Sequence, residues 1–193
     1  MKKSNVSLLL LATYLLSAVS VFGQEKWTTQ LSYGAVRGID KNDKNMIRDY
    51  PSASHFRLET GYKVINNLSA GVYIGYARLH RTLTTDNSFA SSPTNALFYG
   101  LDVDYSVLPL LTGNSNIRFD VYPTLKLGLV SEFWSAPEEN RLRKENNTAF
   151  EVGAGLGVCY KFTPTLGILG EYTAGKFYNS SNSRFHVGVL FNF

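Results

Sequence analysis

The sequence predicts an all-β protein, an eight-stranded antiparallel up-and-down transmembrane β-barrel. Its 193 residues include 12 Tyr, 12 Phe and 16 Gly but only two Met and one Cys, and this length and composition suit a single β domain. Apolar and polar residues alternate in eight segments, with the period of a strand. The connections between these segments differ in length, several long ones alternating with short ones, which is typical of barrels that span an outer membrane.

Residues 1–23 have the features of a cleaved secretory signal peptide. Lys2 and Lys3 precede a short apolar stretch, and Val21-Phe22-Gly23 fits a cleavage site, with Ser20 as an alternative cut point. The barrel domain is therefore expected over residues 24–193. The apolar stretch is shorter than the ~18–20 residues of a spanning helix, which argues against a membrane anchor. Without its two lysines the chain keeps 17 of 19 basic residues against 15 acidic ones, so the charge predicts no nucleic-acid partner.

The first four strands are expected where apolar residues recur at every second position, at 26–36, 55–65, 68–78 and 96–107. A long polar connection, 37–54, follows the first strand, and another, 79–95, follows the third. Only Asn66-Asn67 separates the second strand from the third, which is the length of a tight hairpin turn.

The last four strands are expected, by the same alternation, at 116–130, 149–160, 165–176 and 184–193. Their connections are short, long, short and intermediate in turn: 108–115, 131–148, 161–164 and 177–183. Pro123 lies within the fifth strand although it lacks the N–H that a sheet ladder uses. We therefore expect a bulge at Pro123, or a position of Pro123 near one rim of the barrel.

The alternation divides the strand residues into two sets. The apolar set occupies every second position of 27–35, 56–64, 68–76, 97–107, 117–129, 150–160, 166–174 and 185–193, and none of its 44 residues is charged. The interleaved set holds eleven charged residues and twelve of the sixteen glycines. Successive side chains of a strand point to opposite faces, so one face of the sheet is apolar and the other is charged.

Two architectures fit this division: a soluble barrel or sandwich with the apolar set inside, and a membrane barrel with the apolar set toward lipid. The interior of an eight-stranded barrel is just wide enough for side chains to fill it, and 44 mostly bulky residues would overfill it. We therefore expect the apolar set to face lipid. The interleaved set is then expected to fill the lumen with a network of paired charges, formed by Arg57, Glu59, Lys63, Asp102, Asp104, Arg118, Asp120, Lys126, Glu151, Glu171, Arg184 and His186.

Aromatic residues of the apolar set fall near the ends of the strands. Such positions match the aromatic belts at the two membrane interfaces. The expected girdle consists of Trp27, Tyr62, Tyr105 and Tyr160 at the turn-side rim and Tyr76, Tyr99, Phe150 and Tyr172 at the outer rim. Short turns are periplasmic in barrels of this kind, so an even number of strands places both mature termini in the periplasm.

The final segment, from Arg184 to Phe193, alternates and ends on a phenylalanine. It resembles the assembly signal of bacterial outer-membrane proteins, carried here by Phe185, Val187, Val189, Phe191 and Phe193. Together with the signal peptide and the eight strands, it makes residues 24–193 similar to the small outer-membrane β-barrel domain family, of the OmpX and OmpA-transmembrane type. The resemblance implies a Gram-negative outer membrane as the location. It implies outer-membrane lipids, lipopolysaccharide, periplasmic chaperones and the barrel-assembly machinery as partners; a monomer is expected.

The charged interior and the long outer connections indicate a non-enzymatic barrel without a cofactor, acting in membrane integrity or surface interaction. A narrow pore is one alternative, although eight strands leave little bore. A lipid-modifying enzyme is another, using a serine, His80 and an acid, but no Gly-x-Ser-x-Gly motif occurs. His55 at the outer mouth, His80 in a connection and His186 lie too far apart in sequence to predict a metal site. Three basic residues of the fifth connection are candidate partners of lipopolysaccharide phosphates: Arg141, Arg143 and Lys144.

Overall fold

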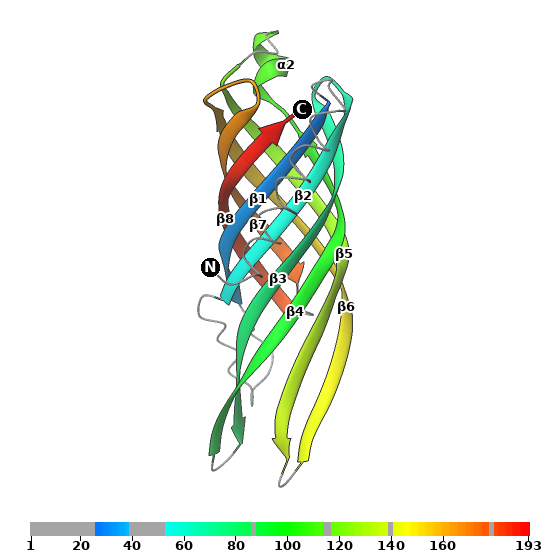
Figure 1. Ribbon diagram of the computed structural model, residues 1–193, viewed down its shortest axis with the longest axis vertical. Helices are drawn as coiled ribbons and strands as arrows, with labels where there is room; N and C mark the ends of the chain where they lie inside the picture. Colours follow the sequence, from blue (N-terminus) through cyan, green and yellow to red (C-terminus); the bar gives the residue numbers. More distant parts are fainter. Residues whose placement is uncertain (1–25, 39–52, 86–87, 114–116, 139–140, 178–179) are drawn as a thin grey trace, which may run out of the picture.

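The computed structural model describes residues 26–38, 53–85, 88–113, 117–138, 141–177 and 180–193. These residues form a closed barrel whose eight strands follow chain order, with every neighbouring pair antiparallel. Figure 1 shows the strands tilted around one common axis. The predicted fold class, an eight-stranded antiparallel up-and-down barrel, is confirmed. The expected signal peptide, residues 1–23, lies outside the described residues.

The strands agree with the expected ones in number and order, and four of them are clearly longer. They are β1 (Trp27–Gly38), β2 (Ala53–Ile65), β3 (Leu68–Thr85), β4 (Ser88–Tyr105), β5 (Phe119–Glu138), β6 (Arg141–Lys161), β7 (Leu166–Phe177) and β8 (Ser180–Asn192). One short helix, α2 (Leu108–Thr112), lies between β4 and β5. Within the described part of the chain, no helix has the length and apolar character needed to cross a membrane.

The connection expected as a loop at 79–95 is almost entirely strand. β3 and β4 stay paired as far as Thr85 and Ser88, whereas the pairing of β2 with β3 ends at Arg78. The two strands therefore continue as a two-stranded extension, the β3–β4 ribbon, beyond the closed barrel (Figure 1). The loop expectation was wrong because polar residues such as threonine also favour strands, and those of this segment continue the β3–β4 ladder.

A second extension, the β5–β6 ribbon, replaces the long loop expected at 131–148. β5 and β6 remain paired as far as Glu138 and Arg141, while the pairing of β4 with β5 ends at Trp134. Both ribbons project from the same end of the barrel (Figure 1). We call this end the hairpin end, and the opposite end, where the short connections lie, the turn end.

The connection expected as a simple turn at 108–115 contains α2. Pro109 lies in its first turn, where the missing N–H costs no helical hydrogen bond. The Asp120 Oδ1 atom on β5 accepts a hydrogen bond from the N–H of Leu108 at 3.2 Å. The helix ends at Gly113, whose φ of 66° lies in the left-handed region that glycine adopts without strain.

Pro123 sits in β5 without a bulge, since its register with Leu156 of β6 is continuous. The carbonyl of Val121 accepts a hydrogen bond from the N–H of Val107, just past the end of β4. Alternate residues of a strand address the same neighbour, so the nitrogen of Pro123 also faces the β4 side. The β4–β5 ladder begins only at Thr124. The proline therefore removes no ladder bond, and it lies near the turn end rather than in a bulge.

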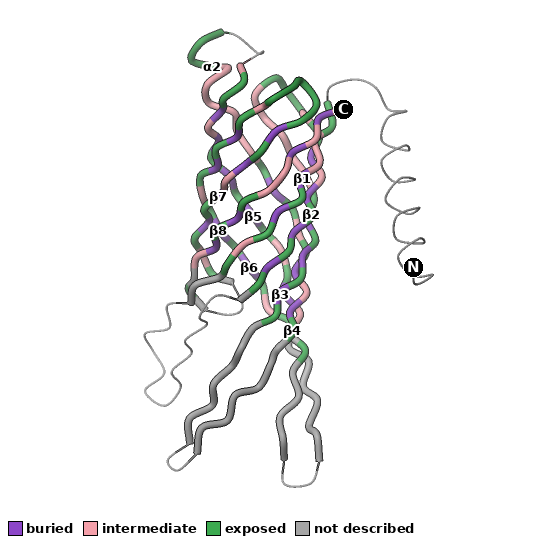
Figure 2. Tube along the Cα trace, turned by 60° about the vertical axis from the view of Figure 1, so that its left-hand side comes forward, coloured by how far each residue is buried: buried purple, intermediate pink, exposed green. Residues whose placement is uncertain are grey.

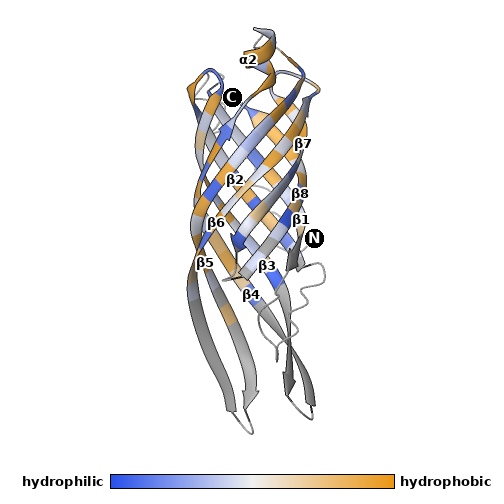
Figure 3. Cartoon of the chain, turned by 180° about the vertical axis from the view of Figure 1, so that it is seen from behind, coloured by the Kyte–Doolittle hydropathy of each residue, from blue (hydrophilic) through white to orange (hydrophobic). Residues whose placement is uncertain are grey.

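The two sets of strand residues face the directions expected of a membrane barrel. Leu31, Val72 and Leu101 of the apolar set are more than half exposed on the outside, whereas Arg57 and Glu151 of the interleaved set are at most 2 % exposed. Figure 2 shows buried and exposed residues alternating along the described strands. Figure 3 shows apolar and polar residues interspersed along the described strands. Within the described strands, the buried charged residues thus lie inside the barrel and the apolar residues of the other set lie outside.

The pairing of β1 with β8 closes the barrel. At the turn end, the N–H of Trp27 donates to the carbonyl of Phe193 at 3.1 Å, and the N–H of Phe193 donates to the carbonyl of Trp27 at 2.9 Å. This reciprocal pair joins the first and last strands at the end of the barrel that also carries α2 (Figure 1).

Candidate functional site

The candidate site is the barrel interior, where inward side chains form two ionic clusters and a cavity. The central cluster consists of Arg57, Glu59, Lys126 and Glu171. The hairpin-side cluster consists of Tyr73, Glu151 and Arg184, with Phe98, His55 and His186 packed around it. A cavity, the turn-end cavity, lies toward the turn end and is lined by residues near the strand ends there.

The central cluster is a closed ring of alternating charges contributed by β2, β5 and β7. Arg57 Nη1 lies 2.7 Å from Glu171 Oε1, and Arg57 Nε lies 3.3 Å from Glu59 Oε2. Lys126 Nζ lies 2.7 Å from Glu59 Oε2 and 3.7 Å from Glu171 Oε1. Two cations thus face two carboxylates, so the ring is neutral, as buried charges require.

The hairpin-side cluster is centred on Glu151 of β6. One carboxylate oxygen accepts a hydrogen bond from the Tyr73 hydroxyl at 2.6 Å, and the other accepts one from Arg184 Nη2 at 2.8 Å. The guanidinium of Arg184 also lies over the ring of Phe98, 5.0 Å from its centroid, within cation–π distance. Donors on both oxygens hold Glu151 in a fixed position across the lumen.

Two histidines lie beside this cluster. His186 Nε2 and His55 Nδ1 are 2.8 Å apart and share a hydrogen bond, and the ring of His55 meets Phe98 edge-on. His55, expected at the outer mouth, is fully buried and lies next to the hairpin-side end of the β2–β3 ladder. The alternation that turns Arg57 inward also turns His55 inward.

Glycines of the interleaved set make room for the large inward side chains. A Cβ atom at Gly157 would overlap the ring of Tyr122, and one at Gly75 would overlap the ring of Phe98. The absence of a side chain at these two positions therefore lets an aromatic ring from the neighbouring strand lie flat over the sheet. The glycine enrichment seen in the sequence is a packing requirement of this narrow lumen.

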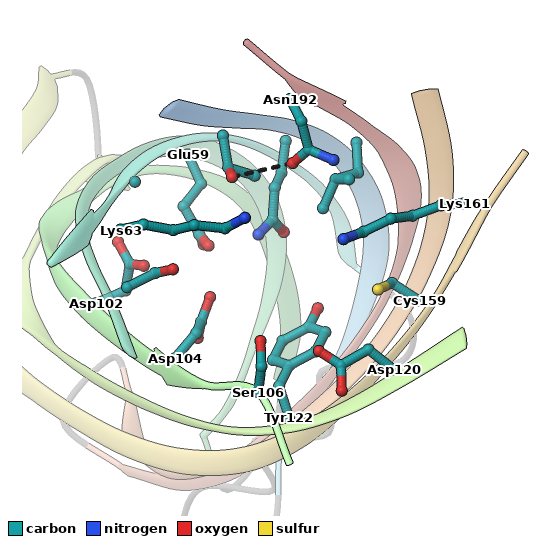
Figure 4. Close-up of a pocket in the computed structure, with 15 residues that line it drawn as sticks. Glu59, Lys63, Asp102, Asp104, Ser106, Asp120, Tyr122, Cys159, Lys161 and Asn192 are labelled. Carbon is teal, nitrogen blue, oxygen red and sulfur yellow. Dashed lines mark hydrogen bonds between the residues drawn. The ribbon is translucent and has the colours of Figure 1, made fainter. Parts of the chain in front are cut away.

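The turn-end cavity has a volume of about 60 Å³. Inward residues of the expected network line it, and Figure 4 shows Glu59, Lys63, Asp102, Asp104 and Asp120 around it. None of the hairpin-side cluster lines the cavity. Since Glu59 belongs both to the cavity wall and to the central cluster, that cluster forms the inner limit of the cavity.

Arg118 is the one exposed member of the expected network. Its carbonyl accepts a hydrogen bond from the N–H of Lys161 at the turn end. β5 begins at Phe119 and not at residue 116, so Arg118 precedes the strand. Asp120 is buried, but its Oδ1 atom accepts the N–H groups of Leu108 and Val121 and is not engaged in an ion pair there.

Sequence reasoning missed the aromatic members of the interior. Tyr73, Phe98 and Tyr122 are buried and point inward, although the expected network contained only charged residues and His186. All three belong to the interleaved set, so their parity was the available signal. They are not charged, so the pattern of charged residues does not reveal them.

The expected girdle residues lie on the outer surface of the barrel. Trp27 and Tyr62 pair across β1 and β2 with ring centroids 5.1 Å apart, and Tyr160 packs against Phe162. Of the expected residues at the hairpin-side rim, all four are exposed: Tyr76, Tyr99, Phe150 and Tyr172. Tyr105 is half-buried on the outside. The expected assembly signal occupies every second position on the outward face of β8 and ends on Phe193, which directly follows the strand. Its residues are Phe185, Val187, Val189, Phe191 and Phe193.

The interior holds opposite charges at fixed positions and shows no activated nucleophile among the described residues. His55 and His186 bond to each other, and the nearest inward serine on β1, Ser32, donates to the carbonyl of Arg57 at 3.5 Å. The side chain of His80 lies outside the described part of the structure.

Comparisons with known structures agree with this geometry. The chain is similar to the neisserial surface protein A (15 % identity, 86 % of this chain and 97 % of that chain, TM-score 0.61). It is also similar to Ail, the attachment invasion locus protein of Yersinia pestis, in complex with the heparin analogue sucrose octasulfate (16 %, 88 % and 100 %, TM-score 0.54). A third similar structure is the N-terminal β-barrel domain of Pseudomonas aeruginosa OprF (15 %, 89 % and 99 %, TM-score 0.51). At these identities the likeness shows the fold.

The family assignment comes from the sequence itself. No curated relative matches the chain. The model of the outer membrane protein beta-barrel domain family matches residues 7–193. This match covers nearly all of the chain, and the closed barrel with its apolar exterior and charged interior is the structure such a domain requires. The chain therefore belongs to the outer membrane protein beta-barrel domain family and is a protein of the outer membrane.

Proposed function

We propose that the protein is a non-enzymatic barrel whose hairpin end serves membrane integrity or surface interaction. The observation that carries the proposal is the contrast between the filled lumen and the ribbons that extend beyond it. Paired charges fill the lumen in two successive clusters, whereas β3–β4 and β5–β6 continue beyond the closed barrel as paired ribbons. A lumen built in this way favours rigidity over transport, and the ribbons enlarge the surface that a partner can meet.

The proposed topology places the turn end in the periplasm and the ribbons outside the cell. Short turns are periplasmic in barrels of this class, and Trp27 and Phe193 meet at the turn end. In this proposal residues 1–23 direct export, periplasmic chaperones carry the unfolded chain, and the assembly machinery reads the last strand, from Phe185 to Phe193. The barrel is proposed to act as a monomer.

Lipopolysaccharide is the proposed lipid partner of the outer leaflet. Arg78 on β3 and Lys176 on β7 are exposed near the hairpin-side rim, beside outward aromatic residues such as Tyr76. Cations just beyond an aromatic belt are well placed to pair with phosphate groups. Arg141, Arg143 and Lys144 of the β5–β6 ribbon remain proposed phosphate partners.

A narrow pore is the second candidate, and the turn-end cavity is the observation that favours it. Conduction through the whole lumen would require both ionic clusters to open. Planar-bilayer recording separates the two candidates: we expect no single-channel steps from the wild-type barrel. Steps that change when Glu151 is neutralised would favour the pore.

Replacing the ribbons tests the main proposal. Residues 79–94 and 135–144 are each replaced by a two-residue turn. We expect both variants to keep the gel shift between boiled and unboiled samples, because the closed barrel is retained, while the deletion-strain phenotype in permeability or surface binding is no longer complemented. Full complementation by both variants would contradict the proposal. Lipid profiling of cells that overproduce the wild type and His80→Ala covers the enzymatic alternative, for which we expect identical profiles.

A further inference from the structure

We propose that the turn-end cavity binds a divalent cation of the calcium class through Glu59, Asp102 and Asp104. One carboxylate oxygen of each residue lies within 4.8 Å of the others. Glu59 comes from β2, and the two aspartates come from successive inward positions of β4. Figure 4 shows the three carboxylates converging on one side of the cavity.

Two uncharged polar side chains in the same cavity point independently to a ligand. Gln30 lies directly opposite Glu59 in the β1–β2 ladder and is 6 % exposed, and Tyr122 is 5 % exposed. Both line the cavity, and neither Gln30 Oε1 nor the Tyr122 hydroxyl has a hydrogen-bond partner among the described residues. Buried polar atoms are normally hydrogen-bonded. An amide oxygen is a regular calcium ligand, and a tyrosine hydroxyl can bond to a water molecule that completes the coordination shell.

The carboxylates themselves have oxygen atoms to spare. Glu59 Oε2 is engaged by Lys126 at 2.7 Å, but Glu59 Oε1 has no hydrogen-bond partner in the described part of the chain. The same holds for Oδ1 of Asp102 and of Asp104. With Gln30 Oε1, four buried oxygen atoms without hydrogen-bond partners thus belong to residues that line this one cavity, and hard cations take oxygen ligands of this kind.

Charge and size favour a divalent ion with long metal–oxygen bonds. Glu59 is balanced by Arg57 and Lys126 of the central cluster, and three aspartates and two lysines, Lys63 and Lys161, are among the other residues that line the cavity. Two ligands on opposite sides of Ca²⁺ lie about 4.6–5.2 Å apart, and those of Mg²⁺ lie about 4.0–4.2 Å apart. The three carboxylate oxygens lie within 4.8 Å of one another, close enough to share one ion whose bonds to oxygen are about 2.3–2.6 Å long. A cavity of about 60 Å³ also has room for several waters, each of which needs roughly 10–15 Å³.

Terbium luminescence tests the site on the barrel of residues 24–193, folded in detergent micelles. Tb³⁺ prefers the same oxygen ligands, and light absorbed by Tyr122 in the cavity wall sensitises its emission. We expect a saturable signal that Ca²⁺ displaces. Asp102→Asn and Asp104→Asn should each weaken Tb³⁺ binding at least tenfold.

Asp120→Asn is the matched control, because it removes the same charge from the same cavity. The Asp120 Oδ1 atom is held by the N–H groups of Leu108 and Val121, so we expect Tb³⁺ binding within about threefold of the wild type. Equal losses in all three asparagine variants would show that only diffuse negative charge attracts the ion and would overturn the site. Wild-type affinity in Asp102→Asn or Asp104→Asn would also overturn it.

Lys63→Met gives a test that does not depend on loss of function. Lys63 lines the same cavity, so removal of its positive charge should tighten Tb³⁺ binding several-fold, whereas unchanged or weaker binding contradicts the site. Calcium should also stabilise the wild-type barrel. At a concentration of 100 times Kd, the unfolding equilibrium constant should fall about a hundredfold; no change would overturn the proposal even if an asparagine variant failed to fold.

Discussion

Arg57 of β2 and Glu171 of β7 form a buried ion pair of 2.7 Å although they lie 114 positions apart in the sequence. β2 and β7 are not neighbours in the sheet, since β1 and β8 lie between them. The pair therefore joins strands that no backbone ladder connects. It fixes the cross-section of the barrel from inside, in addition to the hydrogen bonds of the wall.

Arg57→Met is expected to lower the free energy of unfolding by about 3–5 kcal/mol, the usual cost of leaving a buried charge without its partner. The variant leaves Glu59 and Glu171 with Lys126 as the only cation of the central cluster. Urea unfolding in phospholipid vesicles, followed by tryptophan fluorescence, measures the loss. Lys176→Met removes an exposed cation and should change stability by less than about 0.5 kcal/mol.

The double variant Arg57→Met/Glu171→Met is expected to lose less stability than the sum of the two single variants. It leaves Lys126 and Glu59 as a neutral pair at 2.7 Å, so the charge imbalance of each single variant disappears. A double-mutant cycle measures this coupling. Additive losses would show that the two side chains act independently.

Gly157→Ala is expected to destabilise the barrel by about 1–3 kcal/mol, the range found for overpacked interiors. The new methyl group would overlap the ring of Tyr122, and Tyr122→Leu in the same chain should recover most of the loss. Gly170→Ala on β7 is the matched control, because a Cβ atom added there would lie 3.7 Å from its nearest neighbour, Val158 Cγ2. Equal effects of the two alanines in urea unfolding would contradict the packing explanation.

Pro123→Ala is expected to change stability by less than about 0.5 kcal/mol, since the ring nitrogen faces a side where the β4–β5 ladder has not yet begun. Leu125→Pro places a proline two positions further along the same side of β5, opposite Val103. It removes a ladder bond and should cost about 3 kcal/mol or more. The boiled-versus-unboiled gel shift and urea unfolding distinguish these outcomes.

The direction of the two faces can be tested with neighbouring residues. Leu31→Trp, on the outward face, should be strongly quenched by lipids brominated in the acyl chains. Ser32→Trp, one residue further, points into the lumen and should be quenched several-fold less if it folds; Gln30→Trp serves as a second inward position. Equal quenching at all three sites would reject the assignment of the apolar set to lipid.

The strands and their faces were predictable because a period of two is local information that each segment carries by itself. The inward direction of Arg57, Glu171 and Arg184 followed from that period and from the volume of an eight-stranded barrel. Which charges meet was not predictable, because Arg57 and Glu171 come together only after the whole barrel has closed. The exact strand ends were not predictable either: β5 begins at Phe119 and not at residue 116, so Arg118 precedes the strand.

The ribbons and α2 could not be predicted for a different reason. The ribbon segments are rich in polar residues and lack the apolar alternation by which strands are recognised. α2 has only five residues, too few for a helical period to appear, and Asp120 that holds its first turn lies on the next strand.

The seam between Trp27 and Phe193 has a consequence for biogenesis. Thr28 and Asn192, beside this seam, are bonded across 164 positions of sequence. Pairing over such a separation forms late, since loop closure across it costs the most entropy. Until β8 docks, β1 keeps an open edge that no lipid can satisfy. The nascent domain must therefore stay sheltered from the hydrocarbon phase until its final strand arrives, so insertion and ring closure become a single event.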